Sequence, residues 1–148
     1  MPQKLLPPFL FLICCVAMIT CSLLFPQWTY LPKPWNYLGV PLLLLGLGMV
    51  RNIQGKFKKE ATEINTFKSP KKLVSTGLFH YSRNPIYLGF TLALGGLAIV
   101  LGNYAALDGL IAFFIAAHLW YIPYEEEAME KEFGEAYLDY KSKVRRWL

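Results

Sequence analysis

Four long apolar runs dominate this sequence and limit what it can fold into. They cover residues 8–25, 37–50, 85–101 and 105–122, and Asp108 is the one charged residue inside them. A hydrocarbon core about 30 Å thick needs roughly 20 apolar residues per helix. A chain of 148 residues holds four such helices and little else. Only 17% of its residues are charged, against about 25% in soluble domains. We therefore predict an all-α, polytopic membrane helix bundle, folded as a single domain over residues 1–148.

The flanking residues set the expected bounds of the helices. The second run is short, so it is expected to recruit neighbours at both ends. Gly102-Asn103 is a tight turn that would join the last two spans as a helical hairpin. Predicted spans therefore cover 8–25, 36–53, 85–101 and 105–122, with a polar connector over 51–83.

The carboxyl-terminal part has a different pattern. Pro123 is expected to interrupt the chain after the fourth span. Beyond it, apolar residues recur at spacings of three and four, which predicts an amphipathic helix over 124–144. The residues of this pattern are Met129, Phe133, Ala136 or Tyr137, Tyr140 and Val144.

Basic residues predict how the chain is oriented. With four spans, the amino terminus, the connector and the carboxyl tail share one side of the membrane, where they carry 1, 8 and 5 Lys or Arg residues, 14 in all. The other side has Lys33 alone. An excess of Lys and Arg marks the cytoplasmic side, so we expect both termini in the cytoplasm. The same distribution explains the net charge of +5 without a nucleic-acid partner. The cysteines, all in the first run, have no metal-site spacing, and no metal is expected.

Two polar segments fall where the expected cytoplasmic loops meet the membrane. One contains Arg83-Asn84-Pro85 and the other is Glu125-Glu126-Glu127. Both have an ordinary structural explanation, since Asn and Pro suit a helix start and glutamates suit a first turn. Together they place free amides, carboxylates and aromatic rings at the same face. These groups suit the carboxylate, hydroxyls and sulfonium of S-adenosylmethionine, although the residues alone do not single it out.

At these positions the sequence resembles a known family, the isoprenylcysteine carboxyl methyltransferases and the related phospholipid methyltransferases. Their hallmark is Arg-His-Pro, a long gap and Glu-Glu, matched here by Arg83-Asn84-Pro85 and Glu125-Glu126. Further matches are Leu73-Val74-x-x-Gly77-x-Phe79, Pro85-x-Tyr87-x-Gly89 and a closing segment that ends in Arg146-Trp147. The resemblance covers roughly residues 37–148.

The resemblance implies a membrane methyltransferase that uses S-adenosylmethionine. Its acceptor would be lipid-like or a small apolar molecule that enters from the bilayer. Phospholipid amine, prenyl thioether carboxylate and small thiol all stay open as acceptors. Arg83 and Glu126 are expected either to act near the reacting groups or to form a pair that fixes the pocket. The residues expected to line the cofactor pocket are Leu73, Val74, Phe79, Asn84, Pro85, Tyr87 and Glu125.

Asn84 is a departure from this pattern, because the family has His there. Asn donates and accepts hydrogen bonds but does not titrate near neutral pH, so a cofactor-positioning role is inferred. The same departure motivates the alternative function, a non-catalytic membrane scaffold or cofactor-binding relative. A transporter is disfavoured because no charge occupies the middle of a span.

Overall fold

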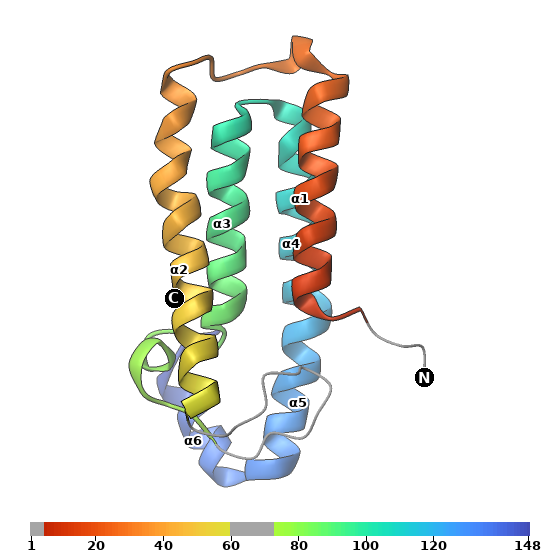
Figure 1. Cartoon of the computed structure of the whole chain (residues 1–148). Helices are drawn as coiled ribbons and strands as arrows, with labels where there is room; N and C mark the ends of the chain where they lie inside the picture. Colours follow the sequence, from red (N-terminus) through yellow and green to blue (C-terminus); the bar gives the residue numbers. More distant parts are fainter. Residues whose placement is uncertain (1–4, 60–72) are drawn as a thin grey trace.

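The computed structural model describes residues 5–59 and 73–148, and in these residues every regular element is helical. An isolated bridge between Thr29 and Asn103 is the one strand-like pairing among them. The all-α prediction is confirmed. The helices, shown in Figure 1, are α1 (Pro7–Leu24), α2 (Gly39–Lys59), α3 (Pro85–Leu101), α4 (Leu107–Ala116), α5 (Ile122–Phe133) and α6 (Glu135–Lys143).

Three helical stretches of the described residues are long and apolar enough to cross a membrane. They are Pro7–Leu24, Trp35–Phe57 and Tyr104–Phe133. The fourth apolar helix, α3, has 17 residues, at the short end of the range of about 17–25 for a spanning helix. It runs beside α2 and packs against α1 and α4 as well (Figure 1). The chain is thus an integral membrane helix bundle.

Loop contacts show which helix ends lie together. The loop between α1 and α2 meets the turn between α3 and α4, where the amides of Tyr30 and Leu31 donate to the Gly102 carbonyl at 2.8 and 3.1 Å. At the opposite end, the Tyr121 hydroxyl donates to the Leu5 carbonyl at 2.6 Å. The start of α1 and the start of α5 therefore share one end of the bundle, which is the lower end in Figure 1.

Glycines let α2 and α3 approach each other closely. A Cβ atom on Gly46 would lie 2.4 Å from both the Gly89 carbonyl oxygen and the Ala93 nitrogen. One on Gly96 would lie 2.3 Å from the Leu43 nitrogen. In lipid no hydrophobic effect drives helices together, and close packing of small residues takes over that role. The contacts of Gly46 with Gly89 and of Gly96 with Leu43 are here called the glycine seam. This seam fixes α3, and with it the start of α3, against α2.

The predicted end of the second span is corrected by the structure. The second helix extends past 53 to Lys59, so the predicted connector begins as helix. Polar residues such as Gln54 and Lys56 are good helix formers, and each added residue gains a hydrogen bond. Residues 60–72 of the connector lie outside the described residues.

Pro123 does not interrupt the chain, contrary to prediction. A π-helical segment, Ala117–Tyr121, joins α4 to α5, and the Ile122 amide donates to the Ala117 carbonyl. The wider π turn accommodates Pro123 without a break in the helix, although proline has no backbone N–H to donate. The predicted helix over 124–144 is instead divided at Gly134, which has φ of +50° and separates α5 from α6.

The glycine seam predicts opposite effects for two substitutions in α2. Gly46→Ala places a methyl group against backbone atoms of α3, and we expect destabilisation of about 1–3 kcal/mol. Gly48→Ala meets no atom within 4 Å, so the higher helix propensity of alanine should leave stability unchanged or raised. Thermal unfolding in detergent measures both. Equal melting temperatures for the two variants would contradict the seam.

Candidate functional site

A buried carboxylate, that of Glu126, is held by two guanidinium groups. Arg83 Nη2 donates to Glu126 Oε1 at 3.0 Å. Arg146 donates to the same carboxylate from Nη2 to Oε2 at 2.7 Å and from Nε to Oε1 at 3.3 Å. The side chains of Arg83 and Glu126 are only 10% and 7% exposed. The structure therefore brings together the two residues expected to be catalytic, as an ion pair shared with a third residue.

The carboxyl terminus lies against the Arg83-Asn84-Pro85 motif. The Arg83 amide donates to the Arg145 carbonyl at 3.0 Å. The side-chain amide of Asn84 donates to the Arg146 carbonyl at 3.0 Å, and Ser82 Oγ reaches the same oxygen at 3.4 Å. Asn84 makes no side-chain cap for α3, so the capping explanation of this residue is wrong. Its side chain binds the carboxyl-terminal segment instead.

Tyr87 and Glu125 form a second contact between α3 and α5. The Tyr87 hydroxyl donates to Glu125 Oε1 at 2.8 Å. Tyr87 is 3% exposed, and its ring stacks on that of Tyr121, with centroids 6.1 Å apart. Tyr121 belongs to the π-helical segment and contributes the hydroxyl bound to Leu5. The start of α5 is therefore tied to both α3 and α1.

The other residues predicted to line the cofactor pocket lie in the segment before α3 and at its start. Pro85 begins α3 and is buried, as is Val74. Phe79 accepts a hydrogen bond on its carbonyl from the Tyr140 hydroxyl at 2.6 Å, and its ring stacks on Phe57. Leu73 packs on a small apolar cluster of α6. These contacts hold the segment before α3 against α6 and the end of α2.

Burial keeps two tyrosines of α6 in their neutral, hydrogen-bond-donating form. Burial raises the pKa of Tyr140 to about 12, against the opposing effect of the Arg83 charge. Burial also raises the pKa of Tyr137, and the negative charge of Glu126 adds to that rise. Both tyrosines stay protonated across the physiological range. The bond from Tyr140 to Phe79 is therefore independent of pH there.

Arg146 and Trp147 are the residues whose role the sequence did not disclose. Both belong to the closing segment quoted in the resemblance, but no role was assigned to them. Trp147 Nε1 donates to His118 Nδ1 at 3.1 Å, and its ring stacks on Phe114 with centroids 5.0 Å apart. No residue spacing could show that the last turn of the chain returns to the fourth span.

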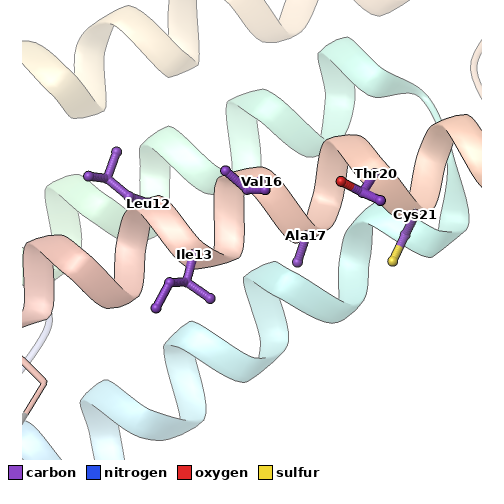
Figure 2. A pocket seen from close by; sticks show the side chains of 6 residues that line it. All are labelled: Leu12, Ile13, Val16, Ala17, Thr20 and Cys21. Carbon is purple, nitrogen blue, oxygen red and sulfur yellow. The ribbon is translucent and has the colours of Figure 1, made fainter.

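An apolar groove lies elsewhere, on the outer surface of α1. Figure 2 shows the side chains that line it, and all of them come from that helix: Leu12, Ile13, Val16, Ala17, Thr20 and Cys21. The groove contains no charged group. It lies on α1 alone, separate from the charged cluster around Glu126.

The sequence of this chain matches one family model and several known proteins. The phospholipid methyltransferase family matches residues 35–136, which include both polar segments. Two rice proteins, from the indica and japonica subspecies, are each named probable protein-S-isoprenylcysteine O-methyltransferase. Each is 27% identical over 139 residues, covering 88% of this chain and 69% of the relative. An uncharacterized Haemophilus influenzae protein is 41% identical over 63 residues, covering 43% of this chain and all of that protein. No solved structure matches.

The buried ion cluster predicts a large effect of removing its carboxylate. Glu126→Ala would leave the buried guanidinium of Arg83 and the partly exposed one of Arg146 without their carboxylate, and breaking a buried pair costs about 3–5 kcal/mol. We expect a markedly lower melting temperature in detergent. Glu127→Ala is the matched control, because Glu127 pairs with Lys131 on the exposed surface and such pairs contribute little. Similar melting temperatures for the two variants would refute the role of the cluster.

Proposed function

The chain belongs to the phospholipid methyltransferase family, and from this premise we propose that it moves a methyl group from S-adenosylmethionine to a lipid-like or small apolar acceptor. The chain is a membrane methyltransferase, and we infer its cofactor, its acceptor and the residues that serve them from the contacts at one end of the bundle. The hydrogen bond between Tyr87 and Glu125 is the main observation that supports this function. This contact joins the two motifs of the resemblance, across 38 residues of sequence, at the end of the bundle where the polar segments meet.

The side chains around this contact fit the groups of the cofactor. Glu125 is half-buried, and its carboxylate suits ribose hydroxyls or an ammonium group. The rings of Tyr87 and Tyr121 stack on each other and are buried, so they would meet a sulfonium only as the inner wall of the proposed pocket. Leu73, Val74, Phe79, Asn84 and Pro85 complete the proposed lining.

The cofactor supplies a methyl group on a sulfonium with its own leaving group, so the protein's part is alignment and exclusion of water. Glu125 would hold the cofactor, and Tyr87 would fix the Glu125 carboxylate through their hydrogen bond. Asn84 would position the start of α3 by binding the Arg146 carbonyl. None of these roles needs a titrating group at position 84. An asparagine there is therefore compatible with activity.

Arg83 and Glu126 are assigned here to fixing the pocket. Both carboxylate oxygens of Glu126 accept hydrogen bonds from arginine, and Arg83 Nη1 also donates to the Lys141 carbonyl at 2.8 Å. A carboxylate bound in this way is poorly placed to take a proton from an acceptor. Of the two roles expected for this pair, support of the pocket is therefore the one we propose.

The acceptor is proposed to come from the bilayer and the cofactor from the cytoplasm. The end of the bundle that holds Glu125 and Arg83 belongs to the side with 14 of the 15 Lys and Arg residues. That excess predicts a cytoplasmic location for both termini. A polar cofactor would reach this end from water, and a lipid-like acceptor would reach it between the spans.

Cofactor binding tests the pocket. Calorimetry in detergent should detect binding of S-adenosylmethionine to the unaltered protein. Glu125→Gln should weaken it by about 10- to 100-fold, the effect of losing a hydrogen bond to a charged group. Glu127→Gln removes an exposed carboxylate two residues away and should bind normally. Equal affinity for the two variants would refute Glu125 as a cofactor ligand.

Methyl transfer tests the reaction. The protein is incubated with cofactor carrying a labelled methyl group and with a total lipid and peptide extract. We expect label in an apolar fraction. Binding without transfer to any fraction would favour the alternative, a non-catalytic cofactor-binding relative, and no binding at high micromolar cofactor would end the proposal.

A further inference from the structure

The last residues of the chain lie among three segments that border the proposed site. Arg145–Trp147, here called the clasp, contacts three separate segments. Backbone carbonyls of the clasp accept hydrogen bonds from the Arg83 amide and the Asn84 side chain. The Arg146 side chain binds Glu126 at the start of α5. The Trp147 ring contacts Phe114 of α4 and its indole donates to His118 of the π-helical segment.

These contacts differ in what they require of the sequence. The two bonds at the Arg83-Asn84 side use backbone carbonyls, which any residue supplies. The bond to Glu126 uses a guanidinium at two nitrogens, and only arginine offers that planar, two-point fit to a carboxylate. Among the contacts of the clasp with the Arg83-Asn84-Pro85 and Glu125-Glu126 motifs, the bond from Arg146 is thus the one that depends on side-chain identity.

We propose that the clasp sets the position of the start of α3 relative to the start of α5, and that Arg146 is a positioning residue for cofactor binding. It acts through Glu126, which adjoins Glu125. Tyr87 of α3 binds Glu125, so a shift of Glu126 alters the contact on which the proposed pocket depends. The effect on cofactor affinity rests on the proposed function, whereas the clasp itself does not.

A neighbouring arginine gives a matched control. Arg145→Ala and Arg146→Ala remove the same charge from adjacent residues of the same segment. The Arg145 side chain is exposed, while Arg146 is bound to Glu126. Both variants keep the carbonyls that bind Arg83 and Asn84, so a difference between them reports on the Arg146 side chain.

Hydrogen exchange tests the clasp without cofactor. In the full-length protein in detergent, Arg146→Ala should speed amide exchange in the peptide that contains Arg83 by about tenfold or more, because loss of a charge-assisted bond loosens the clasp. Peptides of the glycine seam in α2 should exchange as in the unaltered protein. Arg145→Ala should resemble the unaltered protein throughout. Equal exchange in the two variants overturns the clasp whether or not the protein binds S-adenosylmethionine.

Steady-state kinetics tests the positioning role. Arg146→Ala should raise the KM for S-adenosylmethionine by between about 10- and 100-fold, with a smaller effect on kcat. Added ethylguanidinium should restore part of the affinity, which it would not do for a misfolded protein. If Arg146→Ala fails to fold, Arg146→Lys decides the matter, since it keeps the charge but loses the two-point fit. An unchanged KM in the variant that folds overturns the positioning role.

Discussion

A single buried carboxylate organises the end of this bundle. Glu126 would be costly to bury alone, and a buried ion needs both opposite charge and well-aligned hydrogen bonds. Arg83 and Arg146 supply them from opposite ends of a 64-residue stretch of chain, with Glu126 between them in sequence. Meeting this requirement brings together the start of α3, the start of α5 and the carboxyl terminus. The proposed site therefore depends on one electrostatic constraint.

The spans hold this cluster on a rigid base. Close contact between Gly46 and Gly89 packs α3 against α2. The position of the residues at the start of α3 is therefore fixed relative to α2. The π-helical segment sets the rotation of α5 relative to α4, because one extra residue in a helical turn turns everything beyond it by about 100°. Helix packing in the bilayer thus determines which glutamate faces the arginines.

Much of this arrangement was predictable from the sequence. The apolar runs are long, so the all-α membrane fold followed from the thickness of a bilayer. The Tyr87–Glu125 contact was also within reach, since a helical hairpin places its two ends side by side. The rule that proline breaks a helix failed at Pro123, where a π turn accommodated the proline. Apolar periodicity failed at Gly134, whose positive φ divides the helix that the spacing had joined. The clasp was out of reach because Arg146 meets Glu126 through tertiary folding of α6, which leaves no trace in residue spacing.

The adjacent glutamates show how environment divides roles between identical side chains. Residues next to each other on a helix point about 100° apart, so Glu125 and Glu126 cannot face the same surroundings. Glu126 is 5% exposed and is bound by both arginines, which suits it to join α3, α5 and the carboxyl-terminal segment. Glu125 is half-buried beside Tyr87 and the stacked rings, which suits it to meet a ligand. A sequence motif of two glutamates thus supplies one buried structural residue, Glu126, and one residue, Glu125, that we propose faces the cofactor.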